Sequence, residues 1–180
     1  LPGSGNIIAG RSAVIRNFAS DTNAALVARA GIKAAFGYNP MSTVAWKGKR
    51  PNTRMGALAI LRGQLDAVQE KIAKQKKGRG KGAKGKKVEV TFTSEEAVLR
   101  DLLLGKERLR VHVHKIDDIA ALLRIVDEYK LKITVEHAGD VHEPAIFREL
   151  AKRRIPVVYG PIDCFAYKVE LKHESWKHTR

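Results

Sequence analysis

Three histidines in the C-terminal half of the sequence have the residue type and the spacing of metal ligands. His112 and His114 lie two residues apart at the end of the apolar stretch 108–114 (RLRVHVH), and His137 ends the similar stretch 132–137 (KITVEH). Neutral imidazole is a common ligand of zinc and of related divalent ions. A metal-bound histidine usually donates its second ring N–H to a carboxylate or carbonyl group. Four carboxylates nearby in the sequence are candidates for this second contact: Asp117, Asp118, Glu136 and Asp140.

The same histidines also fit an ordinary structural interpretation. A single histidine in a strand is more often a satisfied core or rim residue than a ligand, and an H-x-H pair alone is a weak signal. His114 and His137 occupy matched positions, since each ends a strand-like stretch. With these matched positions, a metal site and a structural role are about equally well supported. Alternation along the strand places His112 on the same side as His114, one layer deeper, so we expect it to be structural. The remaining histidines are interpreted as surface or loop residues: His142, His173 and His178.

The stretches that carry these histidines belong to the most regular part of the sequence. Apolar stretches at 108–114, 132–137 and 155–160 alternate with two segments of helical spacing, and His114 and His137 are 23 residues apart. This repeat predicts an α/β fold with consecutive parallel strands joined by crossover helices. The carboxyl ends of such strands line one edge of the sheet, which is where the sites of parallel α/β proteins lie.

Apolar spacing and capping signals predict the other elements. The expected elements are a strand at 12–18, a short buried strand at 32–36 (with helix as the alternative), a helix from Thr53 to about Lys74, a strand at 87–92, a helix opened by a Thr93/Glu96 capping box, a helix capped by Asp117 or Asp118, and a helix with Pro144 in its first turn.

The 180 residues suit a single domain, and their charge is strongly basic. Thirty-four Lys and Arg residues against nineteen Asp and Glu give a net charge of +15, of which the tract at 76–87 (KKGRGKGAKGKK) supplies seven charges. This tract has too few apolar groups to offset its ordering entropy, so we expect a flexible basic loop. A basic nucleic-acid-binding module is therefore an alternative function, although no aromatic residues are interleaved for base stacking. The single cysteine, Cys164, excludes an internal disulfide and fits a cytoplasmic location, and no apolar run approaches the ~20 residues of a membrane span.

Four motifs resemble the metal-dependent amidohydrolases related to imidazolonepropionase. They are a PGS-x-N turn in LPGSGNIIAGRSAVIRN, a GxK-xxxGxNP segment in AGIKAAFGYNP, an N-T-R-M-G helix start in RPNTRMGALAILR, and an H-x-H-x-x-D-D-I strand end in VHVHKIDDIAALLRIVDEYKLKITVEHAGD. The resemblance implies an α/β hydrolase with a TIM-like (β/α) barrel and one or two divalent ions, zinc above all. It also implies that His114 is the ligand on the fifth strand and His137 the ligand on the sixth. Lys33 would be the fourth-strand lysine that many relatives carry as a metal-bridging carbamate, with a salt-bridged or surface lysine as the alternative.

The chain departs from this family at both ends of the pattern. The H-x-H pair of the first strand and the general-base aspartate of the eighth strand are absent, so no catalytic base is assigned to this chain. A whole barrel takes about 250 residues, and residues 1–180 are therefore expected to be the central part of one, an incomplete barrel.

The expected reaction of the intact enzyme is hydrolysis of a non-peptide (cyclic) amide C–N bond in a small molecule. We expect the isolated chain to be inactive and its exposed strand edges to be covered by the missing barrel segments or by a homo-oligomer. A structural module that keeps the fold without the chemistry is the remaining alternative.

Overall fold

The computed structural model describes residues 3–42, 51, 53–80 and 90–160. Its strands form one sheet in which the spatial order, β1-β2-β3-β4-β5, follows the sequence. β1 (Ile8–Ile15) pairs antiparallel with β2 (Leu26–Ala35), and β3 (Leu109–Val113), β4 (Ile133–His137) and β5 (Val157–Tyr159) continue from β2 as parallel strands. The predicted run of parallel strands in an α/β fold is confirmed.

The bounds of the helices are α1 Thr22–Ala25, α2 Tyr38–Ser42, α3 Arg54–Gly80, α4 Ser94–Leu103, α5 Ile116–Tyr129 and α6 Pro144–Lys152. Four of the helices correspond to segments predicted from the sequence (α3 to α6), whereas α1 and α2 were not predicted. The Thr93/Glu96 capping box opens α4 with both of its reciprocal hydrogen bonds, and Pro144 lies in the first turn of α6. Both local predictions are confirmed.

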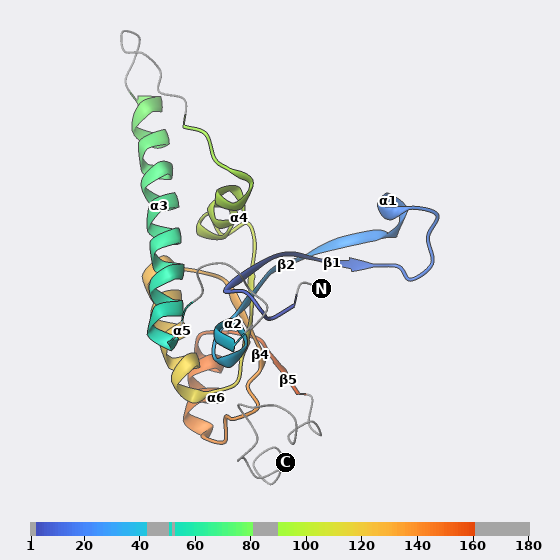
Figure 1. Cartoon of the computed structure of the whole chain (residues 1–180), viewed down its shortest axis with the longest axis vertical. Helices are drawn as coiled ribbons and strands as arrows, with labels where there is room; N and C mark the ends of the chain where they lie inside the picture. Colours follow the sequence, from blue (N-terminus) through green and yellow to red (C-terminus); the bar gives the residue numbers. More distant parts are fainter. Residues whose placement is uncertain (1–2, 43–50, 52, 81–89, 161–180) are drawn as a thin grey trace.

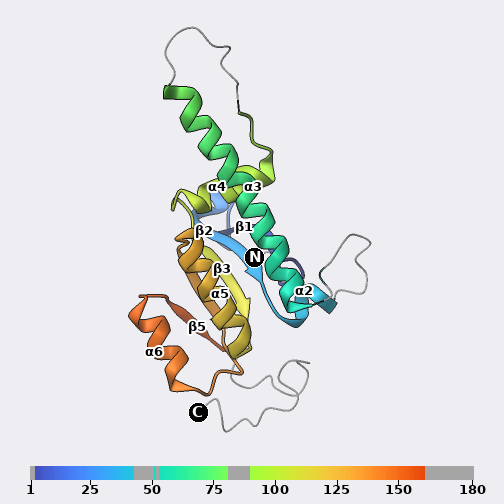
Figure 2. The same ribbon diagram turned by 90° about the vertical axis from the view of Figure 1, so that its left-hand side faces the viewer.

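Helices α3 and α5 cover one face of the sheet (Figure 2). Ile32, Val111 and Val135, from three adjacent strands, are wholly buried in the same apolar cluster as Leu65 of α3 and Leu122 of α5. Burying one such side chain stabilises a fold by about 1.5–3 kcal/mol. This layer of apolar contacts fixes the strands relative to one another, and therefore the ends that carry the histidines.

The other face of the sheet is polar and yet buried. The register pairs Lys33 with Arg110, and it aligns Ala35, His112 and Glu136 in one row across β2, β3 and β4. Because neighbouring residues in register share a face, these polar side chains lie opposite the helical layer. Lys33, His112 and Glu136 are all buried. In a closed (β/α) barrel the corresponding face is the interior.

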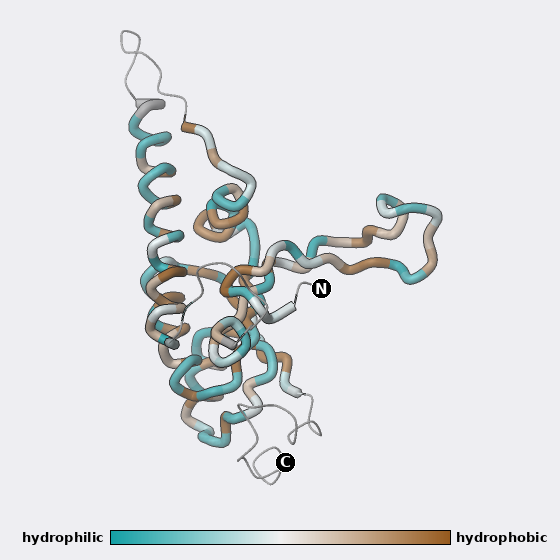
Figure 3. The backbone as a smooth tube through the Cα atoms, viewed as in Figure 1, coloured by the Kyte–Doolittle hydropathy of each residue, from teal (hydrophilic) through white to brown (hydrophobic). Residues whose placement is uncertain are grey.

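A β-hairpin arm extends away from the body of the protein (Figure 1). It consists of the distal halves of β1 and β2 with α1 between them. Five apolar side chains lie exposed along it: Val14, Ile15, Phe18, Leu26 and Val27. The hydropathy colouring of the backbone shows hydrophobic stretches in this arm (Figure 3).

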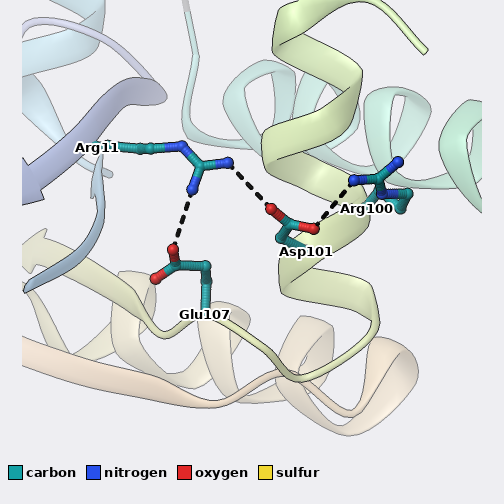
Figure 4. Close-up of polar contacts among 4 residues, drawn as sticks. All are labelled: Arg11, Arg100, Asp101 and Glu107. Atoms are coloured by element: carbon teal, nitrogen blue, oxygen red, sulfur yellow. Dashed lines mark hydrogen bonds and ion pairs between the residues drawn. The ribbon is translucent and has the colours of Figure 1, made fainter. Parts of the chain in front are cut away.

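Arg11 anchors the arm near its base. Its two terminal nitrogens lie 3.0 Å from Asp101 of α4 and 3.0 Å from Glu107 in the loop before β3 (Figure 4). Arg100 also contacts Asp101, and the two guanidinium groups together outweigh the effect of burial and lower the pKa of that carboxyl group.

The structure differs from the sequence pattern in several local details. The first strand spans Ile8–Ile15 rather than the predicted 12–18. The predicted strand at 87–92 is not formed by residues 90–93, and residues 87–89 lie outside the described residues. Helix α3 continues to Gly80, so residues 76–80 of the basic tract are helical, and 81–87 lie outside the described residues. The tract offers no apolar face, and helix propagation from the preceding turns accounts for the extension.

The start of α5 is also different from the prediction. Lys115 occupies the N-cap position without a side-chain hydrogen bond, and Asp117 and Asp118 both lie in the first turn. Carboxylates in a first turn still favour the helix, because they face the positive end of its dipole. Among the residues that the structure describes, none of the helices combines the length and apolar character that a membrane span requires.

Candidate functional site

Three imidazole rings meet at the carboxyl ends of β3 and β4. The ring centroids of His112 and His114 are 4.8 Å apart, those of His112 and His137 are 4.6 Å apart, and those of His114 and His137 are 5.1 Å apart. The rings of His114 and His137 are close to parallel, with 20° between their planes. His114 is only 1% exposed. The structure thus brings together the two histidines that the sequence predicts as a pair, and it adds His112 to them.

His137 joins this cluster because its backbone leaves the regular strand conformation. In register it pairs with Val113, whose side chain lies in the helical layer, so regular alternation would direct His137 to that apolar face. Its φ of 80° is in the left-handed region, as is the φ of 50° at Ala138. This reversal accounts for the ring lying beside His112 and His114. Such conformations are uncommon outside glycine and persist only where the surrounding structure holds them.

Hydrogen bonds fix the orientation of two of the rings. Nδ1 of His137 lies 2.6 Å from the carbonyl oxygen of Gly160, and because a carbonyl can only accept, Nδ1 carries the proton. In the neutral ring the lone pair is then on Nε2, and a hydrogen bond of this kind is the usual second contact of a metal-bound histidine. Nε2 of His112 lies 3.0 Å from the side-chain amide of Asn39, which also donates to Ser4 at 2.7 Å.

Lys33 lies on the same face of the sheet, one row below the histidines. Its Nζ forms an ion pair with Oε2 of Glu136, and Arg110 lies 2.5 Å from Oε1 of the same carboxylate. Burial alone would raise the pKa of Glu136, but the hydrogen bonds and charges of Lys33 and Arg110 outweigh it and hold the pKa below its usual value. Lys33 is thus a buried lysine whose partner in this structure is Glu136.

The other candidate carboxylates also have basic partners or lie in solvent. Asp118 is buried, and the desolvation raises its pKa, although Arg54 at 3.0 Å partly opposes this effect. Asp140 is buried and pairs with Lys115 at 3.0 Å. Asp117 is exposed on the first turn of α5.

The donor chemistry of the cluster suits a borderline-soft divalent ion. Three imidazoles lie within about 5 Å of one another, two of them buried (His112 and His114) and the third (His137) partly buried with its Nε2 lone pair set by Gly160, and imidazole is among the ligands that zinc prefers. Within the described ranges, however, no group of three or more His, Cys, Asp or Glu side chains is arranged to hold an ion. By their chemistry, the imidazole donors fit such an ion.

A separate cleft of about 500 Å³ lies near the start of β1. It is formed by residues 5–10 together with Ile60 and Gln64 of α3 and Val98 of α4, among others. None of the three histidines lines it. The cleft is therefore distinct from the histidine cluster.

The sequence did not single out three contributors to the cluster. Asn39 holds His112, Gly160 orients His137, and Arg110 shares Glu136 with Lys33. Alternation within RLRVHVH places Arg110 on the same face as His112, so the sequence pattern could have identified Arg110. Asn39 lies in the short helix α2 and Gly160 directly follows β5, and only the folded chain shows their contacts.

The comparisons with known proteins agree with this architecture. No protein-family model matches the sequence, and no match was found among curated proteins. Among solved structures, the chain is similar to an amidohydrolase from Thermotoga maritima MSB8, with a TM-score of 0.80 and 31% sequence identity. The match covers 96% of this chain and 44% of that one, so the chain spans less than half the length of the amidohydrolase. The open parallel sheet matches part of a TIM-like amidohydrolase fold. The chain is thus similar in both fold and sequence to part of an amidohydrolase.

Proposed function

We propose that the chain forms the central part of a metal-dependent hydrolase that cleaves non-peptide (cyclic) amide C–N bonds in small molecules. The observation that carries this proposal is the convergence of His114 and His137 at the carboxyl ends of adjacent parallel strands, the edge at which barrel enzymes place their sites. The similarity to an amidohydrolase supports the reaction class. The imidazolonepropionase-related branch is part of the proposal and rests on the sequence motifs.

His114 and His137 would hold the ion, with zinc as the preferred metal because imidazole is among its usual ligands. A bound divalent ion supplies Lewis acidity toward the substrate carbonyl and lowers the pKa of a water molecule. Gly160 fixes the ring of His137, and Asn39 engages Nε2 of His112, which suits His112 for a supporting role. Lys33 would enter the ligand set only as a carbamate, a change that would separate it from Glu136.

The isolated chain is proposed to be catalytically inactive. The chain matches 44% of the related amidohydrolase, and the general-base aspartate expected from the family has no counterpart in this sequence. The β5 edge and the outer edge of β1 would pair with the missing barrel segments or with a second copy of the chain. Either source could supply the further ligands that the cluster needs.

The test is the metal content of the full chain purified without chelators, measured by plasma mass spectrometry. His114→Ala and His137→Ala are compared with His142→Ala, a matched control at an exposed histidine. Near-stoichiometric zinc in the wild type and in His142→Ala, lost in the other two variants, supports the proposal. Metal that is retained in both ligand variants would assign it to another site and overturn the role of this pair.

A second arm of the test adds the missing segments. If the wild type holds no metal alone, the barrel segments are supplied as a separate polypeptide or a fusion, and metal content is measured again. Uptake that depends on His114 and His137 supports the proposal, and no uptake contradicts it. Turnover of a cyclic amide by the isolated chain would contradict the predicted inactivity.

A further inference from the structure

An ion pair joins the two loops that follow the candidate ligands. Lys115 comes directly after His114, and Asp140 lies three residues beyond His137. The Nζ of Lys115 and an oxygen of Asp140 are 3.0 Å apart, and the Asp140 side chain is about 10% exposed. The pair therefore ties the loop between β3 and α5 to the turn after β4.

Backbone hydrogen bonds between these loops extend the pairing beyond the strand ends. The N–H of Ala138 donates to the carbonyl of Val113 at 2.9 Å, and the N–H of Asp140 donates to the carbonyl of His114 at 3.1 Å. A further bond from the N–H of Val141 to the carbonyl of Ala138, at 3.0 Å, closes the turn. Asp140 thus holds the neighbouring loop through both its backbone and its side chain.

This turn includes the left-handed residues that bring His137 to the histidine cluster. His137 and Ala138 have φ values of 80° and 50°, which non-glycine residues retain only when other contacts hold them. Without such contacts the backbone would relax toward the extended conformation, and the ring of His137 would turn toward the apolar face. The contacts of Asp140 lie within three residues of the strained pair.

We propose that Lys115 and Asp140 are positioning residues whose ion pair holds the turn after β4 and thereby keeps the ring of His137 against that of His114. Asp140 then acts through the backbone of the ligand-bearing loops. The proposal rests on the proposed function only in taking these two rings as metal ligands. Its structural part, the holding of the turn, can be tested in the metal-free chain.

The first experiment measures amide hydrogen exchange in the metal-free chain. Lys115→Met and Asp140→Asn are compared with Lys115→Arg, which keeps the charge, and with Arg62→Met. Arg62 pairs with Glu128 at 2.8 Å and joins α3 to α5 without contacting the turn, so it controls for the loss of any inter-element ion pair.

We expect exchange at Ala138 and Asp140 to become about tenfold faster or more in the first two variants, while amides of the β3 and β4 interiors keep their protection. Lys115→Arg and Arg62→Met should retain the wild-type pattern. Unchanged protection at both amides, or a uniform loss over the whole sheet, would overturn the proposal. Lys115 is partly exposed and Asn has the shape of Asp, so both variants should fold.

The second experiment titrates the full chain with Co²⁺ alone and records its visible spectrum. Loss of a contact that orients a ligand typically weakens metal binding by about 10- to 100-fold. We expect Lys115→Met and Asp140→Asn to lose at least about tenfold in Co²⁺ affinity and to show altered absorption bands, with Lys115→Arg restoring both. Wild-type affinity and bands in both variants would overturn the proposal. Failure of the wild type to bind Co²⁺ even with the missing barrel segments added would count against the proposed function instead, and the exchange experiment would still decide the positioning role.

Discussion

Glu136 on β4 pairs with both Lys33 on β2 and Arg110 on β3, so that one carboxylate links three adjacent strands on the polar face of the sheet. It lies immediately before His137, and its row in the register also contains His112. Removing its charge would leave two cations without their shared partner, one of them buried. This ion-pair group is therefore expected to influence both the stability of the sheet and the geometry of the strand end beside it.

Glu136→Gln should lower the free energy of unfolding at pH 7 by about 3 kcal/mol, because breaking a buried ion pair leaves an uncompensated charge. The measurement is urea denaturation of the metal-free chain. Glu128→Gln, which breaks the exposed pair with Arg62, is the matched control and should change stability by less than about 1 kcal/mol. Equal losses of unfolding free energy in the two variants would show that the buried ion pair stabilises the protein no more than the exposed pair does.

The acid dependence of stability should change in opposite directions in two variants. The folded-state pKa of Glu136 lies below its unfolded value of 4.5, so its contribution to stability is present above pH 4.5 and is lost as the pH falls toward the folded pKa. Asp118 has a folded-state pKa above its unfolded value of 3.8, so it favours folding at low pH and loses that contribution as the pH rises through the folded pKa.

Glu136→Gln should therefore flatten the rise in unfolding free energy with pH below 4.5, and Asp118→Asn should steepen the rise between pH 3.8 and the raised pKa. Unfolding curves at half-unit pH steps from 3 to 6 would reveal both changes. Slopes that shift in the same direction would contradict the assigned pKa directions.

Gly31→Ala should destabilise the protein by about 3 kcal/mol or more, because both the backbone conformation and the space oppose a side chain. Gly31 has a φ of 88°, and an added Cβ would lie 2.5 Å from the carbonyl oxygen of Arg108, which accepts a hydrogen bond from Ile32. Gly63 is the control, since it is an exposed helical position with open space around it. Gly63→Ala should raise stability by about 1 kcal/mol. Thermal denaturation of the two variants side by side tests the contrast.

Lys130→Gly should stabilise the protein by about 1 kcal/mol, since an L-residue in the left-handed conformation is disfavoured by roughly that amount. Lys130 ends α5 with a φ of 55° and is exposed, so the substitution removes little packing. Arg124→Gly, at an exposed position inside the same helix, should instead destabilise by about 1 kcal/mol. A loss of stability in Lys130→Gly would mean that the lysine side chain contributes more than the backbone strain removes.

The sequence by itself determined the order and type of the elements in the C-terminal half. Apolar alternation at 108–114 and 132–137, with amphipathic segments between, specifies parallel strands because a crossover helix can return to the sheet in few ways. The helix starts at the Thr93/Glu96 capping box and at Pro144 could also be predicted from local sequence, since each depends on residues within one turn of helix. The matched strand ends indicated His114 and His137 as candidate ligands, and the resemblance to one family then assigned them to the fifth and sixth strands.

The tertiary structure decided how the polar residues meet. Alternation alone would place His137 on the apolar face, and only the left-handed backbone at His137 and Ala138, held by contacts to the β3 loop, accounts for its ring lying beside His112 and His114. The pairing of Lys33 with Glu136 joins residues 103 positions apart, and that distance is closed only by the register of three strands. Local sequence fixes periodicity because it acts within a few residues, whereas these contacts depend on packing between segments far apart in the chain.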